Sequence, residues 1–249
     1  MSGHSKWSQI KRQKGANDVR RGALFTKMGR EIAIAARAGG PDPDGNFRLR
    51  LAIEKARSVN MPADTIKRAI ERATGGGEAD QYEEIVYEGY GPGGVAILVE
   101  AQTDNRNRTA AEVRSVFAKS GGQLAGSGAV AWQFEPRGVI TVARTAGDPD
   151  EIALLAIDAG AEDVDTDADP MEVYTAATEL ERVRRALEAA GVAIESAESA
   201  MIARQTVELD PARARQALRL IEALEDLDDV QRVTANFEIP EEVFAEVAG

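Results

Sequence analysis

Cationic side chains crowd the start of the chain, around its single histidine and one of its two tryptophans. Lysine and arginine neutralise phosphates and release condensed counterions, which gives affinity for a polyanion without sequence specificity. A tryptophan ring adds a surface on which an unpaired base can stack. The residues of this segment that suit such chemistry are His4, Lys6, Trp7, Lys11, Arg12, Lys14, Arg20, Arg21, Lys27 and Arg30. Together they favour nucleic-acid binding.

The alternative is that the cations form a solvated helix face and that Trp7 packs on a helical core. The distribution of charge bears on the first part of this choice. Residues 1–72 hold sixteen Lys and Arg against seven Asp and Glu, a net charge of +9, whereas the remaining residues carry −21. Solubility alone does not explain why a protein of net charge −12 gathers its cations at one end, so we interpret them as functional. For Trp7 the two interpretations are equally supported.

A second group of candidates lies in the stretch Gln102–Thr109. It joins a predicted buried strand to the start of a predicted helix, where free backbone N–H groups favour anions. Arg106 and Arg108 add two guanidinium groups, which can bind phosphate through two parallel hydrogen bonds. The alternative is a helix capped by asparagine whose two arginines pair with nearby carboxylates. The sequence supports both interpretations equally.

No set of residues indicates catalysis, a metal site or a cofactor, and we predict that the protein is not an enzyme. The chain has no cysteine, no Gly-x-Ser-x-Gly turn and no Walker-type phosphate loop. The acidic run Glu162–Asp169 resembles a calcium loop, but Ala168 and Tyr174 stand where an EF-hand needs glycine and a carboxylate. We interpret this run as a solvated strand edge.

The sequence also predicts no membrane partner. No apolar run approaches the ~20 residues that span a bilayer. The first residues, Met1 to Lys6, are not followed by the apolar stretch of a secretory signal. We therefore expect a cytoplasmic protein.

Hydrophobic periodicity predicts that a three-helix domain positions the N-terminal cations. Leu24, Met28 and Ile32 recur at helical spacing between residues 17 and 37, and Gly39-Gly40-Pro41 ends the pattern. Similar patterns predict helices over residues 47–59 and from Pro62 to the glycines at 75–77. We therefore predict a basic helical domain over residues 1–77.

Beyond residue 77, short apolar or alternating segments replace the helical pattern and predict two α+β domains. In the first, residues 78–135 plus 204–249, we expect strands over 84–90, 95–99, 130–134, 205–209 and 230–239 and helices over 108–119 and 211–228. In the second, residues 136–203, we expect strands over 138–143, 162–167, 171–176 and 193–202 and helices over 150–159 and 178–190. Each set contains the order β-α-β-β-α-β of a ferredoxin-like unit. The predicted fold class is multidomain α+β, with an N-terminal three-helix domain followed by two ferredoxin-like α+β domains, one inserted in the other.

Several motifs resemble the YebC/PmpR family. They are Met1–Trp7, Phe25-Thr26-Lys27, Asn60-Met61-Pro62, Tyr87–Gly94, Thr103–Thr109 and Ser127–Phe134, and they extend over the whole chain. These proteins are bacterial regulators related to a mitochondrial translational activator of cytochrome oxidase. The resemblance implies a non-enzymatic cytoplasmic protein of three domains, described in the family as a probable transcriptional regulator that binds DNA. It also implies a second possibility, a translation factor that acts on the ribosome when peptide-bond formation stalls.

Three functions remain to be distinguished. A DNA-binding transcriptional regulator agrees with the resemblance, although the sequence shows no helix-turn-helix spacing with an evident recognition helix, and an acidic body suits duplex DNA poorly. An RNA-binding translation factor suits a basic segment that carries His4, Lys6 and Trp7, because folded RNA rewards stacking and charge. A protein-interaction module would act through the acidic domains. The expected partners are therefore DNA or ribosomal RNA, with the ribosome as the second possibility.

Overall fold

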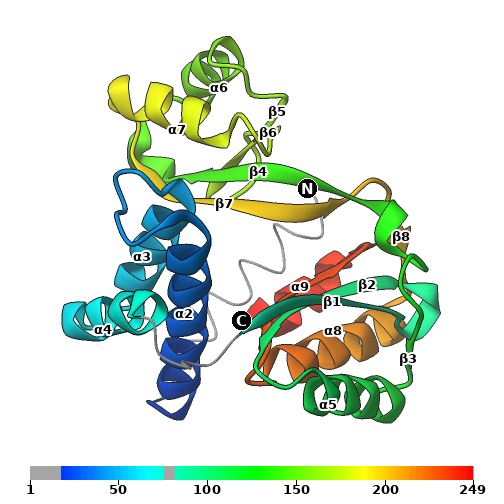
Figure 1. The fold of residues 1–249 in the computed structure, drawn as a ribbon. Helices are drawn as coiled ribbons and strands as arrows, with labels where there is room; N and C mark the ends of the chain where they lie inside the picture. The colour runs from blue at the N-terminus through cyan, green and yellow to red at the C-terminus, as the bar shows by residue number, and fades with distance from the viewer. Residues whose placement is uncertain (1–17, 76–81, 249) are drawn as a thin grey trace. The chain divides into compact units, whose positions relative to one another are not determined.

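The computed structural model describes residues 18–75 and 82–248 (Figure 1). The described residues divide into two compact units. One contains residues 18–75, 82–131 and 210–233, and the other contains residues 132–209 and 234–248. Within these described ranges, no helix has the length and apolar character that crossing a membrane requires.

The first unit begins with the three predicted helices, α2 (Asp18–Gly39), α3 (Phe47–Ser58) and α4 (Ala63–Thr74). Their apolar side chains recur every three or four residues and therefore form one stripe on each helix. Ile32, Leu49 and Ile66 come from the three stripes and meet in a single buried cluster. The predicted helical N-terminal region is confirmed.

A buried asparagine holds the start of α3 against the end of α2. The Asn46 side chain accepts a hydrogen bond from the backbone N–H of Leu49 at 3.1 Å, which caps α3. Its amide nitrogen donates to the carbonyls of Ala35 and Gly40, each at 2.8 Å. Gly39 has no side chain to interfere, since a Cβ there would lie 2.7 Å from the Asn46 side chain.

Helices α3 and α4 are joined by only four residues, Val59 to Pro62. Asn60 has a φ of 61°, a left-handed conformation that asparagine tolerates better than most residues. Pro62 then takes an extended conformation as the N-cap residue of α4. A turn of three or four residues between two helices is the connection length found in helix-turn-helix motifs. The sequence shows no evident helix-turn-helix spacing here, because a proline and a left-handed asparagine replace the more usual glycine.

A four-stranded sheet in the order β3-β1-β2-β9 completes the first unit. Its strands are β1 (Glu83–Tyr90), β2 (Ala96–Thr103), β3 (Gln123–Leu124) and β9 (Val230–Ala235). Strands β1 and β2 form an antiparallel hairpin around the short 3-10 helix Pro92–Gly94. Helices α5 (Arg106–Lys119) and α8 (Pro211–Glu225) lie side by side along the same face of the sheet (Figure 1). Phe117, Leu220 and Leu224 are fully buried there.

The second unit contains the predicted β-α-β-β-α-β order, and this prediction is confirmed. Its elements are β4 (Phe134–Val142), α6 (Pro149–Asp158), β5 (Asp163–Asp165), β6 (Met171–Ala176), α7 (Leu180–Ala189) and β7 (Ile194–Ala203). The sheet order β5-β6-β4-β7 is antiparallel throughout, as in a ferredoxin-like fold. Strands β8 (Val207–Glu208) and β10 (Phe237–Glu238) form a separate parallel pair, followed by α9 (Glu241–Ala248).

The predicted strand over residues 130–134 is wrong. Residues 131–133 form a 3-10 helix, and Trp132 is 69% exposed. The buried carboxylate of Glu88 in β1 accepts hydrogen bonds from the backbone N–H groups of Gly128, Val130 and Ala131 at 2.6, 2.7 and 2.8 Å. These backbone groups bond to a side chain and not to a neighbouring strand. Burial alone would raise the pKa of Glu88, but the three hydrogen bonds lower the pKa below its usual range.

The strand expected over residues 205–209 is also shorter than predicted. Only Val207 and Glu208 pair, and they pair with β10. Segments 130–134 and 205–209 were expected to be strands of the four-stranded sheet. In the structure, the sheet contains β1 and β3 instead. The boundaries of the three predicted domains, at residues 77, 135 and 203, stay a prediction.

Two glycines of α2 provide a test of how closely Asn46 packs. Gly39→Ala should lower the free energy of unfolding by about 1–3 kcal/mol, because the new methyl group displaces the buried cap. Gly29→Ala is the matched control, since a Cβ there meets nothing within 4 Å. It should stabilise the helix by about 0.5–1 kcal/mol. Urea unfolding of both variants measures the difference, and equal effects would contradict the described packing.

Candidate nucleic-acid interface

The structure describes only part of the predicted nucleic-acid site. His4, Lys6, Trp7, Lys11, Arg12 and Lys14 lie outside the described residues. Arg20 and Arg21 belong to the first turns of α2, but their side chains lie outside the described part. The side chains of Lys27 and Arg30 on α2, and of Arg106 and Arg108 at the start of α5, are described. Three of these four cations bind groups of the chain itself.

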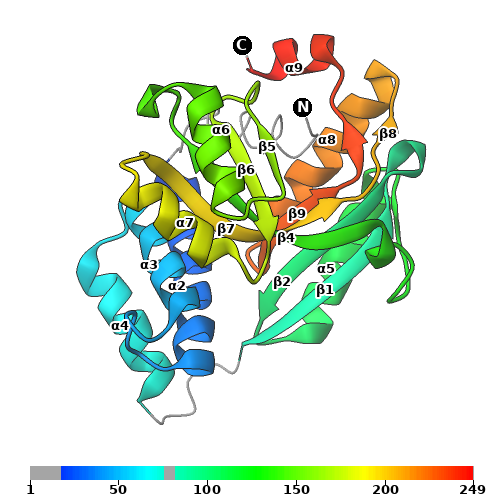
Figure 2. The same cartoon turned by 90° about the horizontal axis from the view of Figure 1, so that it is seen from above.

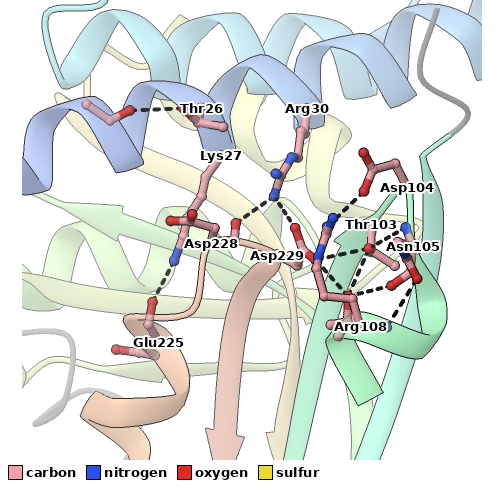
Figure 3. Close-up of polar contacts among 12 residues, drawn as sticks. Thr26, Lys27, Arg30, Thr103, Asp104, Asn105, Arg108, Glu225, Asp228 and Asp229 are labelled. Atoms are coloured by element: carbon pink, nitrogen blue, oxygen red, sulfur yellow. Dashed lines mark hydrogen bonds and ion pairs between the residues drawn. The ribbon is translucent and has the colours of Figure 1, made fainter. Parts of the chain in front are cut away.

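A buried carboxylate, Asp229, is the centre of these contacts (Figure 3). Its side chain is 2% exposed and lies just before β9. One carboxylate oxygen accepts hydrogen bonds from the Thr103 and Thr109 hydroxyls at 3.0 and 2.6 Å. The same oxygen lies 2.7 Å from the Arg108 guanidinium, and the other lies 2.8 Å from that of Arg30. Asp229 therefore joins β2, α5 and α2.

The cations of α2 also bind the carboxyl end of α8. Lys27 donates to the carbonyl oxygen of Glu225, the last residue of α8, at 2.5 Å. Arg30 donates to the carbonyl oxygen of Asp228 at 2.6 Å. The last carbonyls of a helix lack partners within the helix and carry partial negative charge, so cations are favoured there. Figure 3 shows both side chains pointing from α2 towards this end.

At the start of α5, the structure matches the second of the two interpretations for Arg108. Asn105 caps the helix by accepting the backbone N–H of Arg108 at 3.1 Å. The Arg108 guanidinium pairs with Asp104 at 2.8 Å as well as with Asp229. The Arg106 side chain is exposed, and among the described residues no hydrogen bond or ion pair forms at its guanidinium. Arg106 is therefore the more accessible of the two arginines.

The contacts shift the pKa values of both partners. Burial alone would raise the pKa of Asp229, but hydrogen bonds from Arg108, Thr109 and Thr103 and the charge of Arg30 lower the pKa below its usual range. The hydrogen bond to Asp229, and then the one to Asp104, raise the pKa of Arg108. Both shifts favour the ionised pair.

A pocket of about 480 Å³ opens beside this cluster. Its lining includes five carboxylates, two guanidinium groups and one leucine, contributed by Arg30, Asp104, Arg108, Glu112, Asp226, Leu227, Asp228 and Asp229. The excess of carboxylates opposes phosphate binding in the pocket itself. Among the residues that the structure describes, no group of His, Asp and Glu side chains is arranged to hold a metal ion.

The structure also shows cations that the sequence analysis missed. Arg57, Lys67, Arg68 and Arg72 are exposed on α3 and α4. Arg68 donates to the Asp64 carbonyl and the Thr65 hydroxyl of its own helix, and Lys67 lies 3.7 Å from Glu71. Lys67, Arg68 and Arg72 are distinguished by their position on α4, the helix that follows the short turn after α3. The turn Asn60-Met61-Pro62 between two helical patterns was the signal that could have identified them.

Comparison with known proteins places the chain in a family. Residues 5–76 match the TACO1/YebC protein N-terminal domain, and residues 82–237 match the TACO1/YebC second and third domain. The chain belongs to the TACO1/YebC family. It is 56% identical to a probable transcriptional regulatory protein of Rubrobacter xylanophilus, over 100% of both chains. It is 58% identical to a protein of the same description from Moorella thermoacetica, over 96% of each chain.

A solved structure that is similar to this chain is that of a conserved hypothetical protein from Aquifex aeolicus, with a TM-score of 0.84 and 49% sequence identity. The match covers 91% of this chain and 93% of that one. It confirms the predicted fold class, and the family match confirms the resemblance found in the sequence. The two relatives are both described as probable transcriptional regulatory proteins.

Replacement of Asp229 tests the central contact. Asp229→Ala should lower the free energy of unfolding at pH 7 by about 3–5 kcal/mol, because it leaves the Arg30 charge mostly buried without its carboxylate. Asp104→Ala is the control. Asp104 pairs with the same Arg108 but is 42% exposed, so the expected loss is below about 1 kcal/mol.

The pH dependence follows from the lowered pKa of Asp229. A carboxylate with a lowered pKa contributes its full stabilisation above the unfolded-state value of about 3.9 and loses it as the pH falls through the folded-state value. The difference between wild type and Asp229→Ala should therefore be constant from pH 7 to about pH 5 and shrink below about pH 4. Urea unfolding across this range measures it. A difference that does not depend on pH, or equal losses for the two variants, would contradict the proposed role of the Asp229 charge.

Proposed function

We propose that this protein regulates gene expression by binding nucleic acid through its basic N-terminal helices, and that its target is DNA. The observation that supports DNA most directly is the four-residue turn between α3 and α4, which has the connection length of a helix-turn-helix motif. In DNA-binding proteins with this connection, the second helix enters the major groove and its first residues contact the bases. Here that helix is α4.

Helix α4 has the two faces that this role requires. Ile66, Ala69 and Ile70 lie on the side that packs against the helical core. Lys67, Arg68 and Arg72 are exposed. Lysine and arginine contacts to phosphates position a protein on the duplex, and arginine also recognises guanine edges. Helix α4 is therefore our candidate recognition helix.

Lys27, Arg30 and Arg108 should contribute less to nucleic-acid binding than their charge suggests, because they already bind groups of the chain itself. Each already has acidic or carbonyl partners, so nucleic acid would have to replace those partners before a phosphate gained full contact. We therefore propose that α4, Arg106 and the predicted cations before residue 22 make most of the contacts. If about six phosphates are contacted, the logarithm of the binding constant should fall with the logarithm of the salt concentration with a slope near −5.

The second candidate is an RNA-binding translation factor on the ribosome. The charge distribution favours it, because residues beyond 72 carry a net charge of −21 and would repel the long backbone of duplex DNA. Folded RNA also offers unpaired bases for Trp7, for which stacking is worth roughly 1–3 kcal/mol. Crosslinking in living cells and sequencing of the attached nucleic acid separates the two. Promoter DNA at discrete positions supports the first proposal, and ribosomal RNA at a few positions supports the second.

The variant Arg68→Ala with Arg72→Ala tests the role of α4. Affinity for duplex DNA should fall about tenfold, and the salt slope should decrease in magnitude by about 2, one for each lost phosphate contact. Arg182→Ala with Arg185→Ala is the control, because it removes the same charge from exposed positions of α7. Fluorescence anisotropy over a salt series measures both quantities. Equal affinities for the two double variants would exclude α4 as the recognition helix.

The variant Lys6→Glu with Lys11→Glu tests the predicted basic segment. It should weaken nucleic-acid binding at physiological salt by more than tenfold, because each substitution replaces attraction to phosphate by repulsion. Thermal unfolding followed by circular dichroism should show an unchanged melting temperature. Wild-type affinity in this variant would remove the N-terminal segment from the site and leave α4 as its principal part.

A further inference from the structure

Helix α6 presents three large apolar side chains to solvent. Leu154, Leu155 and Ile157 are 68, 44 and 49% exposed. The inner side of the helix is occupied by Ile152 and Ala156, which are spaced by four residues and buried. Figures 1 and 2 show α6 next to α7 on one side of the β5-β6-β4-β7 sheet. Scattered exposed apolar residues are ordinary, but these three lie within a single turn of one helix.

Carboxylates alternate with these apolar side chains around the exposed side of the helix. Successive residues of an α-helix are separated by about 100° around its axis. The order around the exposed side is Ile157, Asp150, Leu154, Asp158, Glu151 and Leu155. The outward face of α6 is therefore anionic in its first turn and combines apolar side chains with a carboxylate in its last turn.

The sequence from residue 145 to residue 181 does not neutralise this charge. Residues 145–181 contain twelve Asp and Glu and no Lys or Arg. The next cations along the chain are Arg182, Arg184 and Arg185, and they pair with Glu179, Glu181 and Glu188. The guanidinium of Arg182 also lies beside Gly160, just after the end of α6. In the part of the chain that the structure describes, no cation pairs with Asp150, Glu151 or Asp158. This contrasts with the Asp229 cluster, in which arginines of the chain compensate the buried carboxylate.

We propose that the outward face of α6 is a docking surface for a cationic amphipathic helix of a partner protein. Leucine-like side chains of the partner would cover Leu154, Leu155 and Ile157, as in other complexes where an amphipathic helix lays its apolar face on an apolar surface. Lysine or arginine beside them would meet the interleaved carboxylates. Complementary charge also speeds association and rejects acidic competitors. The proposal does not depend on the target of the basic helices.

Charge disfavours the other simple occupants. A second copy of this chain would bring an identical set of carboxylates against the first, and like charges placed together cost several kcal/mol. Nucleic acid is excluded for the same reason. An uncharged apolar partner would cover the leucines but leave three carboxylates without partners as they lose water. A cationic amphipathic segment satisfies both components of the face.

The test uses a synthetic 18-residue helical peptide with leucine on one face and lysine on the other. Wild-type protein should bind it, and the peptide with glutamate in place of lysine should bind at least tenfold more weakly. Leu154→Ser with Ile157→Ser should weaken binding of the lysine peptide at least tenfold, since both side chains are exposed and their removal leaves the core unchanged. The control is Val86→Ser, which removes an apolar side chain of 53% exposure from β1 and should change affinity less than twofold.

The same titration distinguishes the charged component. Asp150→Asn with Asp158→Asn should weaken binding at least fivefold and reduce its dependence on salt, while leaving the apolar side chains in place. This variant also keeps the test decisive if the serine variant fails to fold. Unchanged affinity in either double variant would overturn the proposal.

Self-association is the remaining arm of the experiment. Sedimentation of the wild type at 100 μM should show no dimer that depends on α6. A dimer that Leu154→Ser with Ile157→Ser abolishes would assign the face to a second copy and overturn the proposal. A peptide of residues 2–20 of this chain could also bind the α6 face more tightly than the lysine peptide does. If that binding is lost in Leu154→Ser with Ile157→Ser, the face belongs to a segment of the chain itself, and the proposal is overturned.

Discussion

The first unit depends on the burial of one negative charge. A carboxylate that is 2% exposed would be strongly destabilising without partners, and Asp229 obtains them from three separate elements. Thr103 comes from β2, Arg108 from α5 and Arg30 from α2. The charge is therefore satisfied only when these elements assemble together. The hydrogen bond from Gln102 to the backbone carbonyl of Asp229, at 2.8 Å, fixes the same turn to the sheet.

A count of formal charges overstates how many cations of the N-terminal helices are available to nucleic acid. The N-terminal 72 residues carry +9, but the charges of Lys27 and Arg30 are already opposed by the carboxyl end of α8 and by Asp229. Their neighbourhood is an acidic pocket, in which a phosphate is disfavoured. The exposed cations of α4 stand outside this cluster. Accessibility therefore separates two groups of cations that look alike in the sequence.

The sequence predicted those parts of the structure whose physical cause is local. Helical periodicity identified α2, α3 and α4, and the split β-α-β-β-α-β pattern identified the second sheet, because each pattern reports which side of an element is buried. The false strand over 130–134 failed because Glu88, more than 40 residues earlier, holds the backbone of that segment. The contacts of Lys27 and Arg30 join residues 198 positions apart, a distance that no periodicity reports. For the same reason, equal support for two roles of Arg108 was the most that the sequence allowed.

Two acidic regions of this protein differ in whether cations of the same chain pair with their carboxylates. This pairing, and not the number of acidic residues, separates a structural role from a binding role. Asp229 and Asp104 pair with arginines of the same chain, so the charge of these two carboxylates is compensated within the fold. Along α6 the carboxylates alternate with exposed leucine and isoleucine and have no cation of their own within residues 145–181. Exposed carboxylates are well solvated and need no explanation by themselves, but water does not solvate the apolar side chains between them favourably. A surface that is both apolar and cationic would complement this combination, which is why the partner proposal rests on α6 and not on the acidic turn before β9.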